Sequence, residues 1–211
     1  MIEKLQKCLY GGKLEEFRVL LESTENVSVV NVFNKIIIAS ENGDVDLVNE
    51  LMGLGFAIPA RFCVAAFCFA ARKGHPEVVK ALIKDMRVNP GVDDNLAIRW
   101  ASWAGHSEIV KLLMRDHRVD PTAVGNEALE LATGNGHLEV VNALLTDELV
   151  DPVGKDAYSI MEAYEVGAID ILEVLLRHSD LYRLEELVEG SILKLVKERI
   201  REQESNFEGA S

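Results

Sequence analysis

Apolar residues recur along this chain with a period of 31 residues. In the unit around Gly105, Ile98 and Ala101 precede the glycine by seven and four residues, and Val110 and Leu113 follow it by five and eight. Spacings of three and four residues predict helices with one apolar face. A fixed period over most of a chain is typical of a stacked repeat protein, because each unit buries its apolar face only against its neighbours.

A glycine and a small residue mark the same two positions of every unit. We interpret the glycine as the left-handed residue just past a helix end, and the alanine four residues earlier as the contact that lets neighbouring helices approach closely. These structural repeat positions are Gly12, Gly43, Gly74, Gly105, Gly136 and Gly167, with Ala39, Ala70, Ala101, Ala132 and Ala163.

Each unit is predicted to hold two helices, one on either side of the glycine. In the fourth unit these span residues 96–103 and 108–115, and the second opens at Glu108, where a carboxylate favours the positive end of the helix dipole. A proline such as Pro90 closes the unit, and we expect it to stop the second helix.

The pattern predicts an all-α solenoid that forms a single domain. Residues 1–180 are expected to hold six helix-turn-helix repeats, followed by a C-terminal helical cap at 181–203 and a polar tail at 204–211. The period fails after Arg177, since Glu198 stands where a seventh glycine would fall. Solenoid ends need caps with a polar outer face, which the charged segment after residue 180 provides.

Two segments resemble the core of the ankyrin repeat: residues 70–79 read AARKGHPEVV, and residues 132–141 read ATGNGHLEVV. The resemblance implies an ankyrin-type solenoid with compact units, since the family's repeat usually has about 33 residues. The family's T-P-L-H tetrapeptide is degenerate here, because LAIR stands at residues 96–99 and EALE at 127–130. We therefore expect short turns in place of the family's β-hairpin fingers.

The composition suits a reducing compartment. Cys8, Cys63 and Cys68 do not form a disulfide framework and are expected to be free, buried thiols. The first seven residues lack the apolar run of a signal peptide, and no stretch is long enough to span a membrane. The expected location is cytoplasmic or nuclear, with neither secretion nor a membrane partner.

Charge is unevenly distributed within a net charge of −13. Residues 61–118 hold ten basic and six acidic side chains, whereas residues 119–211 hold seven basic and twenty acidic ones. The strongly acidic balance argues against nucleic acid as a partner. The acidic C-terminal third could steer a basic partner toward the protein, or could serve only solubility.

The histidines and motifs indicate no catalytic residue, metal or cofactor. His75, His106 and His137 each follow a glycine, so equivalent atoms lie one helix layer apart, roughly 8–10 Å. Zinc needs each ligating nitrogen at about 2.1 Å, and these rings therefore cannot share one ion. The sequence contains no HExxH, GxSxG or phosphate-loop motif. We interpret the chain as not an enzyme.

Trp103 is the most distinctive candidate for partner binding. It lies two residues before Gly105, and the equivalent positions of other units are polar or lack a side chain: Glu41, Arg72, Gly134 and Glu165. We predict that this position faces solvent, and the ankyrin resemblance places it on the concave binding face. The alternative is that the Trp103 ring lies flat on Arg72, while Trp100 is interpreted as core. The predicted partner-binding residues are Arg72, Lys73, Trp103, Asp93, Asp94 and Arg99.

These observations predict a monomeric, non-enzymatic scaffold or adaptor that binds another protein on the concave face of the repeats. The alternative is the substrate-recognition or targeting part of an enzyme or ubiquitin-ligase-like assembly whose catalytic component is another chain. The 31 residues after Asp180 are too few for a catalytic domain of their own.

Overall fold

The computed structural model describes residues 29–53, 58 and 60–179. Within these ranges the regular structure consists of ten α-helices and no strand. The helices are α3 (Val29–Glu41), α4 (Val45–Gly53), α5 (Ala60–Lys73), α6 (Pro76–Leu82), α7 (Val92–Trp103), α8 (Ser107–Leu113), α9 (Ala123–Gly134), α10 (Leu138–Leu144), α11 (Gly154–Glu165) and α12 (Ile169–Arg177).

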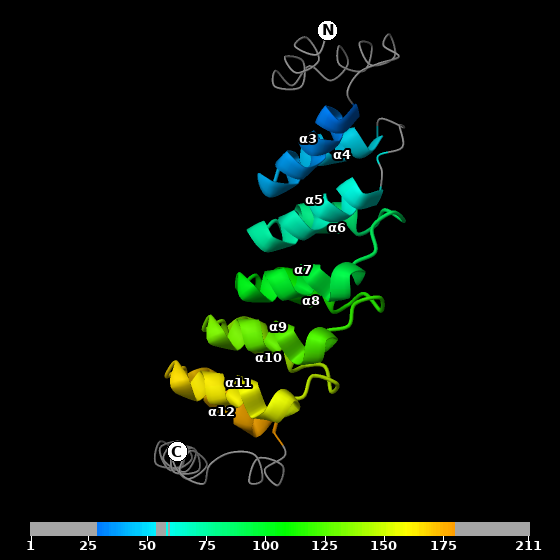
Figure 1. Cartoon of the computed structure of the whole chain (residues 1–211). Helices are drawn as coiled ribbons and strands as arrows, with labels where there is room; N and C mark the ends of the chain where they lie inside the picture. The colour runs from blue at the N-terminus through cyan, green and yellow to red at the C-terminus, as the bar shows by residue number, and fades with distance from the viewer. Residues whose placement is uncertain (1–28, 54–57, 59, 180–211) are drawn as a thin grey trace, which may run out of the picture.

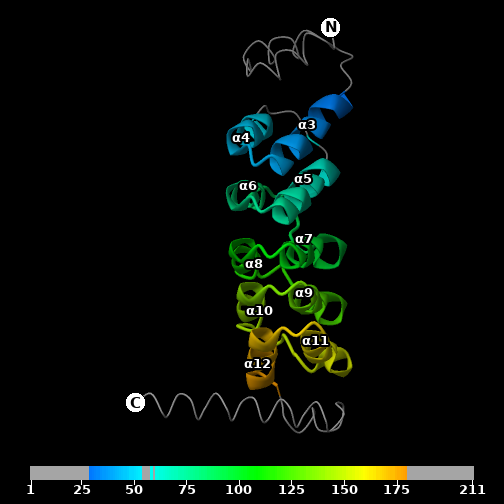
Figure 2. The same ribbon diagram turned by 90° about the vertical axis from the view of Figure 1, so that its left-hand side faces the viewer.

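The helices stack in two layers. The first-helix layer consists of α3, α5, α7, α9 and α11, and the second-helix layer of α4, α6, α8, α10 and α12 (Figures 1 and 2). Each helix packs against its own partner and against the equivalent helix of the next unit. The predicted all-α solenoid of helix pairs is thereby confirmed.

The core follows the 31-residue period. The alanine before each glycine is at most 2% exposed in every described unit: Ala39, Ala70, Ala101, Ala132 and Ala163. The apolar positions seven residues before and eight residues after the glycine are buried as well, as Ile98 and Leu113 show. Small and large side chains at the repeat positions therefore belong to one core that runs through the described units.

The repeat glycines have the predicted left-handed backbone. Gly105 has a φ of 79°, and the other four described repeat glycines have φ values between 71° and 82°. The structure adds a second reason for glycine, because a Cβ placed on Gly105 would lie 2.7 Å from Nδ1 of His137 in the next unit. Gly43 and Gly74 face the next histidine in the same way.

The expected role of the proline is wrong. Helix α6 ends at Leu82, eight residues before Pro90, where the N–H of Asp85 donates to the Leu82 carbonyl (3.0 Å). The N–H of Val88 then donates to the Asp85 carbonyl (2.9 Å). These turn bonds end the second helix, and Pro90 lies just before Val92, the first residue of α7. The link contains no strand, as the shortened repeat predicts.

Helix α7 opens with a left-handed turn that the sequence does not predict, and its right-handed part begins at residue 96, as predicted. Helix α7 starts at Val92, and residues 93–95 have φ values of 49°, 54° and 61°. Residues 124–126 repeat this left-handed turn in α9, with φ values of 57°, 71° and 69°. A left-handed residue costs roughly 1–2 kcal/mol unless it is glycine or a short polar residue such as Asn95. The side-chain oxygen of Asn95 also accepts the N–H of Asp120 (2.8 Å), which ties the turn to the next unit.

Several predictions fall outside the described residues. These are the first unit with Gly12 and Cys8, the C-terminal cap at 181–203 and the tail at 204–211. The boundaries of the repeat domain at 1–180 stay a prediction.

Candidate functional site

A cavity of about 280 Å³ opens on the first-helix layer, where α5, α7 and α9 follow one another. We call it the tryptophan cavity. Its lining residues are Arg72 of α5, Arg99, Trp100 and Trp103 of α7, and Glu127 and Leu131 of α9. Three of the predicted partner-binding residues therefore come together at one place.

Arg72 lies between the two tryptophans. Its guanidinium carbon is 5.3 Å from the ring centroid of Trp100 and 5.6 Å from that of Trp103. A guanidinium within about 6 Å of an aromatic face is attracted by the ring quadrupole. The Trp100 ring also packs at 5.8 Å from the ring of Phe69, tilted by 46°. Arg72 is thus a cation held on an aromatic surface.

The sequence analysis considered that Trp103 either faces solvent or lies on Arg72, and the structure shows both features. Its side chain contacts the Arg72 guanidinium, yet the residue is still 44% exposed. Trp100, in contrast, is partly buried and packs against the core. Trp103 therefore offers an aromatic surface to solvent whose position is restrained by its neighbour.

Arg99 is held by three polar contacts. Its Nε lies 2.8 Å from Oε2 of Glu127, which forms an ion pair between α7 and α9. Its Nη1 donates to the backbone carbonyls of Asp93 (3.3 Å) and Asp94 (3.5 Å). Asp93 and Asp94 contact Arg99 through their backbone carbonyls, are themselves exposed, and do not line the cavity. Lys73 is exposed at the end of α5 and does not line the cavity.

Sequence reasoning missed Trp100, Glu127 and Leu131 as lining residues. Trp100 and Leu131 share one repeat position, five residues before the glycine, which the sequence analysis assigned to the core. Glu127 carries no comparable signal. Its role depends on how far Arg99 reaches across to α9, which the repeat pattern alone does not specify.

The three repeat histidines link neighbouring units. The Nε2–H of His75 donates to the carbonyl of Glu41 (2.9 Å), and those of His106 and His137 donate to the carbonyls of Arg72 (3.1 Å) and Trp103 (3.1 Å). Each ring therefore engages the first helix of the preceding unit. The structural interpretation of these histidines agrees with these contacts.

The described cysteines are structural. Cys63 and Cys68 are free and buried, as expected. Burial raises the pKa of the Cys68 thiol to about 12 and also raises the pKa of Cys63. Neither thiol is therefore a ready nucleophile at neutral pH.

The described ranges show no cluster of three His, Cys, Asp or Glu side chains that could hold a metal ion. Within the same ranges, every helix falls short of the length and apolar character needed to cross a bilayer. The tryptophan cavity is lined by Arg72, two tryptophans and the Arg99–Glu127 ion pair. Arginine and tryptophan side chains are typical of binding sites for other proteins.

The fold defines a helical solenoid built from glycine-marked helix pairs. Residues 36–124 match the family model for ankyrin repeats in three copies, so this part of the chain consists of ankyrin repeats. The helix pairs continue in the same arrangement beyond the matched residues, through α10, α11 and α12. No curated protein matches the chain. Ankyrin repeats are generally modules for binding other proteins.

Proposed function

We propose that the protein is a non-enzymatic scaffold or adaptor that binds a partner protein through the tryptophan cavity, on the concave face of the repeat stack. The observation that carries this proposal is the exposed Trp103 ring restrained by Arg72 beside a cavity. Tryptophan and arginine are the residues most enriched at the energetic centres of protein interfaces. We propose further that the protein is a monomer and acts in the cytoplasm.

The restraint on Trp103 favours binding. Fixing a side chain on association costs about 0.5–1.5 kcal/mol, and a side chain already held by a neighbour loses less. The contact with Arg72 supplies this restraint at Trp103 without burying the ring. A partner therefore meets a preformed aromatic surface.

The charges around the cavity indicate what the partner presents. Arg99 is already paired with Glu127, whereas the Arg72 guanidinium contacts only aromatic rings among the described side chains. A carboxylate of the partner could pair with Arg72 while an apolar side chain packs on Trp103. The proposed partner segment is therefore mixed acidic and apolar.

The test is a comparison of proteins captured by immobilised wild type and by Trp103→Ala. We expect partners of this face to bind the variant on the order of 2 kcal/mol more weakly, about 30-fold. The melting temperature should change little, because an exposed cation–π contact contributes only about 0.5–1 kcal/mol. Captured proteins are identified by mass spectrometry, and affinities are then measured by calorimetry.

Met86→Ala is the matched control. Met86 is 95% exposed in the turn after α6, so its truncation also removes exposed apolar surface, but away from the tryptophan cavity. The control should capture the same proteins as wild type. Partners that bind Trp103→Ala and wild type equally well would refute the proposal, as would a large loss of stability in Trp103→Ala.

A further inference from the structure

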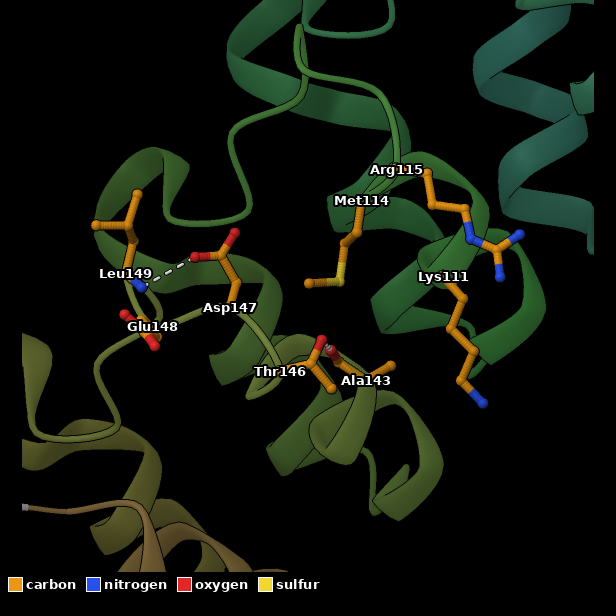
Figure 3. Close-up of a pocket in the computed structure, with 8 residues that line it drawn as sticks. All are labelled: Lys111, Met114, Arg115, Ala143, Thr146, Asp147, Glu148 and Leu149. Carbon is orange, nitrogen blue, oxygen red and sulfur yellow. Dashed lines mark hydrogen bonds between the residues drawn. The ribbon is translucent and has the colours of Figure 1, made fainter.

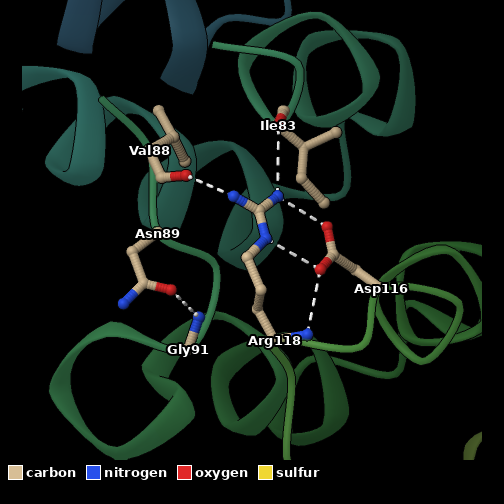
Figure 4. A network of polar contacts seen from close by, with 6 residues as sticks. All are labelled: Ile83, Val88, Asn89, Gly91, Asp116 and Arg118. Carbon is tan, nitrogen blue, oxygen red and sulfur yellow. Dashed lines mark hydrogen bonds and ion pairs between the residues drawn. The ribbon is translucent and has the colours of Figure 1, made fainter. Parts of the chain in front are cut away.

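Arg118 connects two repeats through one guanidinium group. Its Nε and Nη2 donate to the two carboxylate oxygens of Asp116 at 2.9 and 2.6 Å. Its Nη1 donates to the carbonyl of Val88 (3.2 Å) and its Nη2 to that of Ile83 (3.4 Å), both in the preceding unit (Figure 4). A two-pronged arginine–carboxylate pair is among the strongest side-chain hydrogen-bonding arrangements.

The preceding repeat contains the same arrangement. Arg87 donates from Nε and Nη2 to the two carboxylate oxygens of Asp85 at 2.8 and 2.7 Å. Its Nη1 donates to the carbonyl of Ile58 in the unit before (3.2 Å), and its Nη2 lies 3.7 Å from the sulfur of Met52, the repeat equivalent of Ile83. Two successive units thus bind a guanidinium with an aspartate of the same turn and at least one backbone carbonyl of the unit before.

The following repeat keeps the aspartate and lacks the arginine. Asp147 is equivalent to Asp116, and its Oδ1 accepts the N–H of Leu149 (2.9 Å), as the Oδ1 of Asp116 accepts the N–H of Arg118 (3.0 Å). Leu149 stands in place of the arginine and is 74% exposed. Within the described residues, no cationic side chain contacts the Asp147 carboxylate.

A cavity of about 720 Å³ lies at the place where the third guanidinium would be expected. We call it the α8–α10 cavity. Met114, Asp147 and Leu149 line it, and they are the repeat equivalents of the Ile83, Asp116 and Arg118 that take part in the Arg118 contacts (Figure 3). The remaining lining residues are Lys111, Arg115, Ala143, Thr146 and Glu148.

Two cations at the cavity do not prevent a guanidinium from binding. Lys111 and Arg115 lie across the cavity from Asp147 in Figure 3. Their equivalents one unit earlier are Lys80 and Lys84. In that unit the carbonyl of Ile83 accepts a hydrogen bond from the Arg118 guanidinium. The filled copy therefore has positive charges at the same two repeat positions, where Lys80 is paired with Glu77 (2.7 Å) and Glu108 (3.2 Å).

The residue between the aspartate and the missing arginine adds a negative charge. Glu148 stands where the filled copies have Met86 and His117. Each filled copy balances one carboxylate with one guanidinium, whereas the α8–α10 cavity has the two carboxylates of Asp147 and Glu148 and no arginine in this turn. With Lys111 and Arg115 also lining the cavity, the charges of its lining balance, so the case for a guanidinium rests on the equivalence of Asp147 with Asp116 and not on the overall charge.

We propose that the α8–α10 cavity binds the guanidinium of an arginine presented by a partner protein, in the place that Arg118 occupies one repeat earlier. The incoming group would bind the Asp147 carboxylate and the carbonyl of Met114. The proposed occupant is an arginine side chain of a protein, because the filled copies bind the guanidinium of an arginine within a polypeptide. The inference rests on the proposed function only in taking the partner to be a protein, since the two cavities lie on opposite helix layers.

The geometry of the α8–α10 cavity is tested by placing an arginine of the chain itself at position 149. Leu149→Arg should restore the missing contacts and raise the melting temperature by about 2–4 °C. Leu149→Lys is the matched control, because it adds the same charge at the same position without the planar fork that binds both carboxylate oxygens. Leu149→Lys should therefore gain clearly less. Equal melting temperatures for the two variants would overturn the proposal.

Binding in trans is tested with the capped tripeptide acetyl-Gly-Arg-Gly-amide. Titration into the full-length protein should shift the amide NMR signals of Asp147 and Leu149 in a saturable way. The shifts should be absent in Leu149→Arg, where the site is already filled, and at least several-fold weaker with the lysine analogue of the peptide. Absence of binding to wild type, or equal binding to Leu149→Arg, would overturn the proposal.

Trp103→Ala separates this inference from the proposed function. The variant should bind the tripeptide as wild type does, because Trp103 does not line the α8–α10 cavity. Failure of the tryptophan cavity to bind a partner would leave this peptide result unchanged. Loss of peptide binding in Trp103→Ala would instead contradict the assignment of the guanidinium to this cavity.

Discussion

The middle of the stack and its last described repeat share one apolar framework but differ in their polar links. In the middle, the ring of His137 packs over Gly105 and donates to the carbonyl of Trp103. In the last repeat, Ala168 takes the place of the histidine, and no atom lies within 4 Å of a Cβ built on Gly136. A cavity of about 310 Å³ lined by Gly136, Gly167 and Ala168 lies there instead.

The same difference occurs at the turns. The turn after α8 is tied to the preceding unit by Arg118, whereas the turn after α10 has Leu149 at that position. The buried alanines Ala132 and Ala163 are nevertheless as inaccessible as Ala101. The comparison teaches that burial of the apolar residues that recur every 31 positions determines the architecture. The polar links between units can be omitted from a repeat, and a cavity then opens in their place.

The largest expected effect comes from adding a methyl group at two equivalent glycines. Gly105→Ala should destabilise the fold by about 2–3 kcal/mol, because it combines a left-handed residue with a clash against the His137 ring. Gly136→Ala has the same left-handed backbone and no neighbouring ring, so it should cost only about 1 kcal/mol. Chemical denaturation measures both, and equal losses would mean that the histidine contact contributes nothing.

Restoring the missing histidine should stabilise the last repeat. The backbone at Ala168 (φ −80°, ψ 73°) matches that at His106 (φ −85°, ψ 72°), so Ala168→His needs no change of main chain. The new ring would fill the cavity and reach the carbonyl of Gly134, for a gain of about 1 kcal/mol.

Ala168→Leu is the control for the Ala168→His prediction, since it fills the same cavity without a donor. A gain as large as that of histidine would assign the effect to volume alone. The free energy of unfolding of each variant, from urea denaturation, distinguishes the two.

The smallest expected effect concerns pH. Hydrogen bonds from Arg118 lower the pKa of Asp116 from 3.8 to about 2. The folded-state pKa lies below the unfolded value, so the pair stabilises the fold above pH 3.8 and this contribution is lost as pH falls toward 2. The stability difference between wild type and Arg118→Leu should therefore shrink over this range, by less than about 1 kcal/mol at this surface pair.

Arg115→Leu is the control for the pH prediction. It removes a nearby positive charge that is not a partner of Asp116. Its stability relative to wild type should vary less between pH 4 and pH 2 than that of Arg118→Leu. Acid unfolding followed by circular dichroism provides the measurement, and a constant difference between wild type and Arg118→Leu would contradict the assigned pKa.

Much of the tryptophan cavity could be predicted one residue at a time, but its arrangement could not. The polar residues at the Trp103 position of other units indicated an exposed side chain, and the structure leaves Trp103 exposed. The sequence analysis considered a contact of Arg72 with Trp103, but not the second contact of Arg72 with Trp100. The pairing of Arg99 with Glu127 was not foreseen, because it joins side chains from different units whose reach the period does not specify.

The helix starts show the same limit. Residues 93–95 read Asp-Asp-Asn, which tolerate a left-handed backbone, but Val124 adopts it as well, against its own preference. The sequence-based start at residue 96 agrees with the first right-handed residue of α7, but the left-handed turn before it was not predicted. Contacts with the next unit, such as that between Asn95 and Asp120, decide it.

The sequence by itself determined the repeat length, the paired helices, the buried alanine row and the left-handed glycines, because each follows from local backbone preference or from a recurring apolar face. Only the tertiary structure decided which atoms meet between units: the His137 ring on Gly105, the Arg118 guanidinium on carbonyls of the unit before, and the cavity beside Leu149. The physical reason is that these contacts depend on the offset and rotation between adjacent helix pairs, and a period along the chain specifies neither.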